Sequence, residues 1–363
     1  MTQHFDFTFA LHHNLAPAAD RSFCWSPYSV ASAVGMAAAA TAGAAHDELV
    51  SALRCEPAAA LRPLAAAAEL APAPSGEPPV LAVANTLWVH QDLSLNQQFL
   101  GELAAWPGSA VRTAPFRSEP EQARKLINSD VAETTRQLIP ELLPPGTVDP
   151  DTVASLVNAL YLKVAWKEPF DQHQTTQRVF HAPGGDREVP TMRTTRRLGY
   201  AAVDGWQLVG LPAAGGVEAL VLLPDDLPTR EQELTPTRLQ QLLDAVEQQR
   251  VELLLPRFKV TGEPDLQGSM SALGVRTVFT PAADFTPLTS ESLRISTLVH
   301  QSVLEVDESG LEGAAATAAM MRLTSAVREP DPITVEVDRP FLFLVRHQAS
   351  GSLYFLARVT DPS

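Results

Sequence analysis

The order of helical and strand patterns constrains this fold more than any other feature of the sequence. Apolar residues recur at helical spacing early in the chain, over residues 5–15 and 29–55, and Gly43 predicts a break in the second run. Later segments are mostly rich in β-branched and apolar residues, as strands are. The chain shows neither a regular strand–helix–strand rhythm nor an internal repeat. The sequence therefore predicts an α+β protein.

The predicted strands cover residues 80–89, 153–166, 217–224, 251–260, 295–307 and 333–359, the last with a hairpin turn at residues 350–351. Residues 119–139 predict an amphipathic helix. Residues 56–79, rich in Ala and Pro, predict a short helix followed by a loop. Because the Pro-rich stretches are short, none has the character of a domain linker, and we expect one domain over residues 1–363.

Composition and charge narrow the functional classes. Of 363 residues, 45% are apolar and 19% charged, which suffices for a large core. A net charge of −15 argues against partners such as nucleic acids and anionic membranes. Only Arg54 and Arg62 are cationic in the helical region around residues 54–70, so no heparin-type cofactor is expected. The first residues lack a signal-peptide pattern, which predicts a cytoplasmic protein or one exported by an unseen route.

Residues that could bind metals or form disulfides are few. Cys24 and Cys55 lie among apolar or Ala-rich neighbours and are predicted to be small core residues. His12, His13 and His46 lack the spacing of a metal site. Sequence motifs for nucleotide binding, zinc proteases, redox dithiols and α/β-hydrolases are absent. We therefore expect neither a metal nor a cofactor.

Four polar residues could be taken for a Ser-His-Asn hydrolase. Ser26, Ser29, Asn158 and His300 each stand inside an apolar segment, such as "CWSPYSV" and "TLVHQSVL". A catalytic triad needs an exposed nucleophile and an oxyanion hole. Buried polar side chains in such segments usually satisfy one another by hydrogen bonds. We favour a structural network over a catalytic site.

One segment near the end of the chain fits neither a core nor an ordinary linker. Residues 305–333, "EVDESGLEGAAATAAMMRLTSAVREPDPI", follow an apolar run and carry no charge between Glu312 and Arg322. Most side chains in that interval are Gly, Ala or Thr. The segment is too small-sided for a core and unusually uncharged for a solvated loop.

Nine motifs in order give the chain a resemblance to the serpin family along nearly its whole length. They are "WSPYSV", "AHDEL", "ANTLWV", "INSDVAETT", "LVNALYLKVAWKEPF", "LLPD", "LPRFKV", "VHQSVLEVDESGLE" and "VDRPFLFLVR". The Ala- and Pro-rich composition favours a prokaryotic member. The resemblance implies a serpin fold with three β-sheets, a large central sheet A, about nine helices and an exposed reactive-centre loop at about residues 308–332.

The resemblance also implies a function. Serpins are suicide-substrate inhibitors of serine proteases, not enzymes, and a monomer that forms a covalent complex with its target protease is expected. In this family the positions of Ser26, Ser29, Asn158 and His300 form a hydrogen-bonded cluster beneath the central sheet, called the shutter. Asn85 and Thr135 match family positions with structural roles only.

Two further sites follow from the same resemblance. Trp166, Arg257 and Glu308 match the breach, the place at the top of sheet A where the loop first enters. The hinge at the start of the loop comprises Glu308, Ser309, Gly310, Leu311, Glu312, Gly313, Ala314, Ala315, Ala316 and Thr317.

The resemblance implies that the cleaved reactive-centre loop traps the acyl-enzyme by inserting into the central sheet as a new strand. Such insertion would explain the composition of residues 305–333. Side chains of a strand alternate between its faces, so the inward set would be Leu311, Gly313, Ala315, Thr317, Ala319 and Met321. The outward set would be Glu312, Ala314, Ala316, Ala318 and Met320. The one charge before Arg322 then falls on the outward face. A charge on the inward face would be desolvated without a partner, at a cost of several kcal/mol.

The position of the cleaved bond follows from loop length. Inhibitory serpins keep a nearly fixed number of residues between the hinge glutamate and the cleaved bond. Counting seventeen residues from Glu308 therefore predicts cleavage at Thr324–Ser325, with Leu323 as the competing site. Counting back from "VDRPF" gives about Glu329 instead. Thr324 and Leu323 would suit elastase- or chymotrypsin-like pockets, whereas Arg322 and Arg328 would suit a trypsin-like one.

Some positions depart from the family pattern. Ser22 stands where an Asn is usual, Leu311 where a small residue is usual, and Gly313 where Ala is usual. A bulky residue at the start of the hinge could slow entry. The tail "TDPS" is predicted to be a frayed end, with contact to the sheet as the alternative. A serpin that acts only as a substrate or a binding module is the alternative to an inhibitor.

Overall fold

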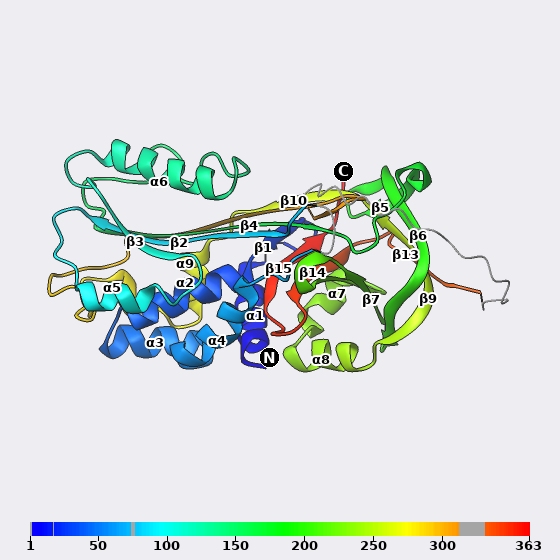
Figure 1. Ribbon diagram of the computed structural model, residues 1–363, viewed down its shortest axis with the longest axis horizontal. Coiled ribbons are helices and arrows are strands. Elements are labelled where there is room, and N and C mark those ends of the chain that lie inside the picture. Colours follow the sequence, from blue (N-terminus) through cyan, green and yellow to red (C-terminus); the bar gives the residue numbers. More distant parts are fainter. Residues whose placement is uncertain (1, 17, 74–76, 312–330) are drawn as a thin grey trace.

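A computed structural model describes residues 2–16, 18–73, 77–311 and 331–363 (Figure 1). This part of the chain contains nine α-helices: α1 (Thr2–Leu15), α2 (Pro27–Ala39), α3 (Gly43–Leu53), α4 (Pro57–Ala68), α5 (Gln97–Leu103), α6 (Pro120–Thr134), α7 (Leu227–Arg230), α8 (Pro236–Asp244) and α9 (Leu266–Ala272). The strands are β1 (Phe23–Trp25), β2 (Val80–His90), β3 (Ser109–Ala114), β4 (Ala154–Ala165), β5 (Thr176–Ala182), β6 (Gly185–Val203), β7 (Trp206–Pro212), β8 (Val217–Pro224), β9 (Glu247–Pro256), β10 (Phe258–Gly262), β11 (Thr297–Val306), β12 (Gly310–Leu311), β13 (Ile333–Glu336), β14 (Phe341–His347) and β15 (Leu353–Val359).

A six-stranded sheet carries the features on which function depends. Its order is β10-β11-β12-β4-β2-β3, and β11 also pairs directly with β4. The β4–β11 pairing is parallel, whereas β2 pairs β4 antiparallel. Helix α6 covers one face of this sheet, and α2 lies on the other (Figure 1). The sheet is therefore covered on both faces.

The second sheet has nine strands, in the order β1-β15-β14-β8-β7-β6-β9-β13, with β5 paired to β6. Strand β6 has 19 residues and pairs with three other strands, β5, β7 and β9. Residues 185–191 of β6 pair with β5, residues 191–200 pair with β9, and residues 199–203 pair with β7. The three sheets expected from the sequence are thus two hydrogen-bonded sheets among the described residues, because β6 is long enough to join two of them.

Two hydrophobic clusters hold the layers together. The main cluster lies on the α2 side of the six-stranded sheet and includes Leu156, Leu304 and Leu311. The second lies between that sheet and α6 and includes Trp88 and Ile127. Alternate residues of β4 and β11 belong to opposite clusters, as the pleat of a strand requires. Both faces of β4 are therefore buried, whereas β11 is buried on the main-cluster face and half-buried on the other.

The predicted elements occur with some changes of boundary. The predicted strand over residues 251–260 is two strands, β9 and β10, which lie in different sheets on either side of Arg257. The tail is not a frayed end, since Thr360 is buried and its backbone N–H donates to the Ser22 hydroxyl over 2.9 Å. Among the described helices, none has the length and apolar character that crossing a membrane requires.

Candidate functional site

The candidate site is a seam between two parallel strands that is closed at one end and open at the other. β4 and β11 pair directly from Ser155 and Thr297 to Leu160 and Ser302. Beyond that point β12 lies between them: Leu311 pairs with Val306 of β11, and Gly310 and Leu311 pair with β4. The first two residues of an additional strand are therefore already in place at the open end.

The two residues of β12, Gly310 and Leu311, have different structural roles. A Cβ atom on Gly310 would come within 2.2 Å of the Val164 carbonyl oxygen, so the close approach to β4 requires glycine. Leu311 is 1% exposed and packs in the main cluster, on the inward face predicted for it. The residue whose bulk could slow entry is therefore already paired between β4 and β11.

A closed turn precedes β12. The Asp307 carboxylate accepts hydrogen bonds from the backbone N–H groups of Ser309 (2.7 Å) and Gly310 (3.1 Å). The Asp307 N–H in turn donates to the Gly310 carbonyl over 3.1 Å. Asp side chains favour such turns because they satisfy backbone donors locally. This turn directs the chain from β11 back into the seam.

Glu308 is the buried charge of the breach. Its side chain is 3% exposed, and its carboxylate accepts bonds from Arg257 Nε (2.7 Å) and from the Thr175 hydroxyl. Burial opposes ionisation of Glu308, but the hydrogen bonds from Arg257 and Thr175 outweigh it and lower its pKa. An ionised carboxylate, bonded to Arg257 and Thr175, thus fixes the start of the hinge.

Trp166 completes the breach. Its indole Nε1 donates to the Asp307 carbonyl over 2.9 Å, and its backbone N–H donates to the Ser309 carbonyl over 3.0 Å. The Phe170 N–H donates to the Glu308 carbonyl over 2.9 Å. The segment just after β4 therefore holds every carbonyl of the turn from Asp307 to Ser309. The structure brings Trp166, Arg257 and Glu308 together at one place.

The four shutter residues also lie together, at the closed end of the seam. His300 Nε2 accepts the Ser26 backbone N–H over 3.0 Å, so the ring proton is on Nδ1 and is donated to Asn158 Oδ1 at 2.5 Å. Asn158 Nδ2 donates to the Ser29 carbonyl (2.8 Å) and hydroxyl (2.7 Å). Asn85, for which only a structural role was predicted, accepts from Ser29 and Asn158.

This geometry does not support a hydrolase. The Ser26 hydroxyl accepts the Ser29 N–H as the N-cap of α2, and the Ser29 hydroxyl donates to Asn85, so no bond joins either hydroxyl to His300. Burial lowers the pKa of His300 to about 3, which makes it a poor base. All four side chains are 1% exposed or less. The shutter is a structural joint between α2, β4 and β11.

Several predicted residues lie outside the described part of the chain. They are Glu312, Gly313, Ala314, Ala315, Ala316 and Thr317 of the hinge, and Leu323, Thr324 and Ser325 at the predicted cleaved bond. The sequence did not predict Asp307 and Thr175. The motif Asp-Glu-Ser-Gly could have indicated the Asp307 turn, whereas nothing links Thr175 to Glu308 across 133 positions.

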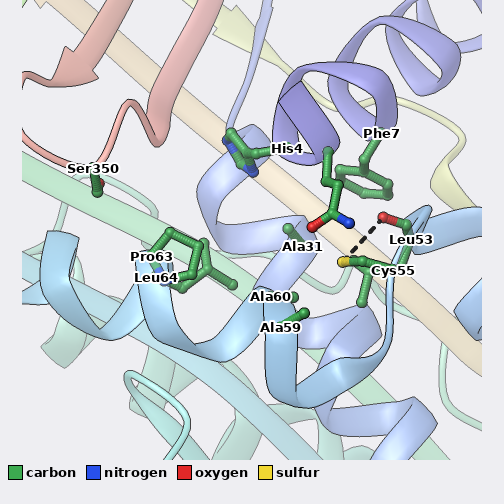
Figure 2. A pocket seen from close by; sticks show the side chains of 11 residues that line it. His4, Phe7, Ala31, Leu53, Cys55, Ala59, Ala60, Pro63, Leu64 and Ser350 are labelled. Atoms are coloured by element: carbon green, nitrogen blue, oxygen red, sulfur yellow. Dashed lines mark hydrogen bonds between the residues drawn. The ribbon is translucent and has the colours of Figure 1, made fainter. Parts of the chain in front are cut away.

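A small pocket elsewhere offers no competing chemistry. It lies between α1, α2 and α4 and is lined by Gln3, His4, Phe7, Ala31, Leu53, Cys55, Ala59, Ala60, Pro63, Leu64 and Ser350 (Figure 2). Burial raises the pKa of the Cys55 thiol, which disfavours the nucleophilic thiolate. His4 Nε2 already accepts the Leu353 N–H. Within the described ranges, no three His, Cys, Asp or Glu side chains are grouped to bind a metal.

Comparisons with known proteins agree with the geometry. The family model "Serpin (serine protease inhibitor)" matches residues 2–362. The chain is 31% identical to Iripin-2 of Ixodes ricinus, over 97% of this chain and 91% of that protein. It is 33% identical to the leukocyte elastase inhibitor of Bos taurus, over 79% of each. The structure of uncleaved ovalbumin superposes with a TM-score of 0.86 at 22% identity, over 99% of both chains.

Proposed function

The chain belongs to the serpin family, and we propose that it is a suicide-substrate inhibitor of serine proteases with chymotrypsin- or elastase-like specificity. The observation that carries this proposal is the open end of the seam. β12 already pairs with β4 on one side and with β11 on the other. The residues after Leu311 would extend β12 along the same direction. For this, β4 and β11 must move apart by one strand spacing.

The proposed reaction begins as an ordinary cleavage of the Thr324–Ser325 bond and stops at the acyl-enzyme. The protease serine Oγ attacks the Thr324 carbonyl carbon and gives up its proton, and the Thr324–Ser325 peptide bond breaks as the new amine of Ser325 takes that proton. An ester then joins Thr324 to the protease. Insertion of residues 312 onwards moves this ester away from its original place before water can hydrolyse it. The protease stays covalently attached, so the reaction ends as inhibition.

The energy for trapping comes from the new strand. Fifteen or so inserted residues, at a net ~1 kcal/mol per hydrogen bond, give on the order of 10–20 kcal/mol. At ~3.3 Å per residue the end of the strand moves about 50 Å. This free energy is withheld before cleavage, so the lifetime of the uncleaved fold is kinetically controlled.

A denaturing gel tests the function. The protein is mixed with chymotrypsin, elastase and trypsin, and the released peptide is identified by mass spectrometry. A stable band at the summed mass, with a peptide that begins at Ser325, is expected with chymotrypsin or elastase. A peptide that begins at Thr324 would move the bond to Leu323. Complete cleavage without a covalent band would mean a substrate or binding module instead of an inhibitor.

A further inference from the structure

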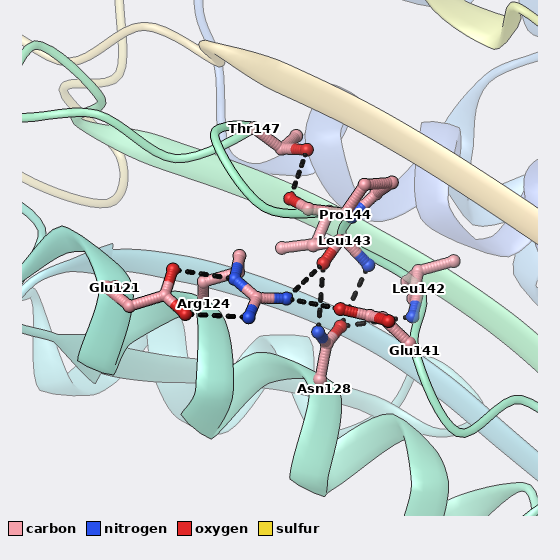
Figure 3. A network of polar contacts seen from close by, with 8 residues as sticks. All are labelled: Glu121, Arg124, Asn128, Glu141, Leu142, Leu143, Pro144 and Thr147. Atoms are coloured by element: carbon pink, nitrogen blue, oxygen red, sulfur yellow. Dashed lines mark hydrogen bonds and ion pairs between the residues drawn. The ribbon is translucent and has the colours of Figure 1, made fainter.

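Arg196 on β6 is a largely buried cation that is not neutralised by a close carboxylate. Its side chain is 12% exposed, and the Glu168 carboxylate lies 3.9 Å from Nη1, too far for a hydrogen bond. Arg124 on α6 is the contrast: its side chain is 8% exposed, and Glu121 and Glu141 each bind it at 2.7 Å (Figure 3). Burial lowers the pKa of the Arg196 guanidinium, and the charge of Glu168 opposes this only in part. A cation at this position therefore needs other contacts to offset its burial.

Those contacts are with the segment that follows β4, residues 166–170. Nη1 of Arg196 donates to the backbone carbonyl of Glu168, and Cζ lies 5.5 Å from the centre of the Phe170 ring. A guanidinium is attracted to the face of an aromatic ring, most strongly where water is excluded, and Phe170 is buried. Arg196 thus holds both the backbone and a side chain of this segment against β6. We call Arg196 with these two contacts the brace.

The same segment holds the turn that precedes β12. The backbone N–H groups of Trp166 and Phe170 donate to the Ser309 and Glu308 carbonyls, over 3.0 and 2.9 Å. The Trp166 and Phe170 rings meet edge to face, with their centres 6.5 Å apart. A shift of Phe170 would therefore move both of these contacts. Arg196 acts on the turn through Phe170.

Arg196 also belongs to a row of paired residues that reaches β13. It pairs with Val251 on β9, and Val251 pairs with Ile333, the first residue of β13. Strands β6, β9 and β13 lie side by side (Figure 1). At ~4.8 Å between neighbouring strands, the Cα atoms of Arg196 and Ile333 are about 10 Å apart. Because the turn at Glu308 begins the reactive-centre loop and β13 follows it, the brace lies between the two ends of the loop.

A second attachment joins the segment to the nine-stranded sheet. The Lys167 N–H donates to the Pro212 carbonyl over 3.0 Å, and Trp166 forms an antiparallel bridge with Ala213, just after β7. These backbone contacts do not depend on the Arg196 side chain. Loss of that side chain should therefore loosen the segment without releasing it.

We propose that Arg196 is a positioning residue for the inhibitory reaction, which fixes the turn before β12 relative to β13 and so sets the separation of the two loop ends. A loop whose ends are held in place loses less conformational entropy when a protease binds it. This purpose rests on the function proposed above. The brace itself is a property of the uncleaved protein and can be tested without a protease.

Hydrogen–deuterium exchange of the uncleaved protein tests the contact. In Arg196→Ala the amides of Trp166 and Phe170 are expected to exchange about tenfold faster, as the loss of one charged hydrogen bond predicts, with the amides of β14 unchanged. Arg197→Ala is the control, because Arg197 is the next residue on β6, points to the opposite face and is exposed. Equal acceleration of the β14 amides would mean that Arg196 only stabilises the whole fold. That result, or unchanged exchange at Trp166 and Phe170, would overturn the proposal.

Pulsed electron paramagnetic resonance tests the separation of the loop ends. Spin labels at Lys167→Cys and Thr334→Cys, both exposed positions, report the distance from the segment to β13 in a Cys55→Ser background. Arg196→Ala should broaden the distance distribution, whereas Arg197→Ala should not. If Arg196→Ala does not fold, Arg196→Lys keeps a cation over the ring but lacks the planar fork, so an intermediate width is expected. A width equal to that of the wild type in the folded variant would contradict the brace.

The denaturing gel reports on inhibition separately. If the wild type forms no covalent band, the proposed function fails, and with it the purpose of the brace, whatever the exchange experiment shows. If the wild type does form the band, Arg196→Ala should form it more slowly than Arg197→Ala, by up to about tenfold, the factor expected for one charged hydrogen bond. Equal rates for the two variants would overturn the role of Arg196 in the reaction.

Discussion

His300 on β11 accepts a hydrogen bond from the backbone N–H of Ser26, the N-cap of α2, over 3.0 Å. The same imidazole donates to Asn158 on β4. One neutral ring thus joins both strands of the seam to the helix beneath them. The closed end of the seam is held by this joint, while the open end is held by the turn at Asp307 and Glu308.

The first prediction concerns the loss of folding stability at acidic pH. Burial lowers the pKa of His300 to about 3, while an unfolded histidine titrates near 6.5. The unfolded chain then binds the proton first, so the stability due to the neutral ring is complete above pH 6.5 and is lost as pH falls toward 3. Between pH 6.5 and 5 this loss is about 2 kcal/mol.

Urea unfolding at pH 7.5 and pH 5 checks this prediction. His300→Gln should lower the stability at both values but reduce the difference between them by about 2 kcal/mol. His181→Gln is the control: its exposed ring bonds to Asp186, which raises its pKa, so its loss should not reduce the acid dependence. An unchanged pH difference in His300→Gln would show that the ring has the same pKa in the folded and the unfolded protein.

The second prediction uses the alternation of the inserted strand. Ala315 belongs to the predicted inward set and Ala316 to the outward set, so the same substitution at these neighbours should have opposite results. Ala315→Glu would bury a charge without a partner, at a cost of several kcal/mol. It should convert the protein from an inhibitor to a substrate, whereas Ala316→Glu should still form the covalent complex. Equal behaviour of the two variants on a denaturing gel would refute this phase.

The third prediction concerns the breach. Arg257→Ala leaves the Glu308 carboxylate, 3% exposed, without its guanidinium partner. We expect the turn to loosen and the amides of Ser309, Gly310 and Leu311 to exchange about tenfold faster, as the loss of one charged hydrogen-bonded contact predicts. Lys259→Ala removes an exposed ion pair two positions along and is the control. No change in exchange would mean that the Asp307 turn alone holds the hinge.

The fourth prediction tests a buried ion pair away from the seam. The Glu231 carboxylate, 3% exposed, binds His12 Nε2 at 3.0 Å and Arg358 at 2.6 Å. Glu231→Gln should cost about 3 kcal/mol of stability, because it leaves a buried guanidinium without its counter-charge. Glu233→Gln, an exposed change in the same single turn of 3₁₀ helix (Glu231–Glu233), should cost no more than about 0.5 kcal/mol in the same urea titration.

Local patterns predicted much of the fold. Strand β8 was predicted with its observed bounds of residues 217–224, because a continuous apolar run between turn residues allows few alternatives. The division of residues 251–260 into two strands was not predicted. That division depends on which sheet each half joins, and such pairing is decided by residues far away in the sequence.

In the candidate site, too, contacts between residues far apart in the sequence could not be predicted from local patterns. The shutter and breach residues were placed by family motifs, and the structure brings them together. Local chemistry alone would not have placed Thr175 against Glu308, since only the tertiary fold brings them into contact. The prediction of a frayed tail is wrong for a similar reason: the Thr360 backbone N–H bonds to the hydroxyl of Ser22, 338 positions earlier.

The most direct test of the account measures the width of the six-stranded sheet. Spin labels at Thr113→Cys on β3 and Thr261→Cys on β10, in a Cys55→Ser background, report the distance across the sheet by pulsed electron paramagnetic resonance. If the loop inserts between β4 and β11 after cleavage, this distance should lengthen by up to one strand spacing, ~4–5 Å. A cleaved protein whose label distance is the same as that of the uncleaved protein would contradict strand insertion.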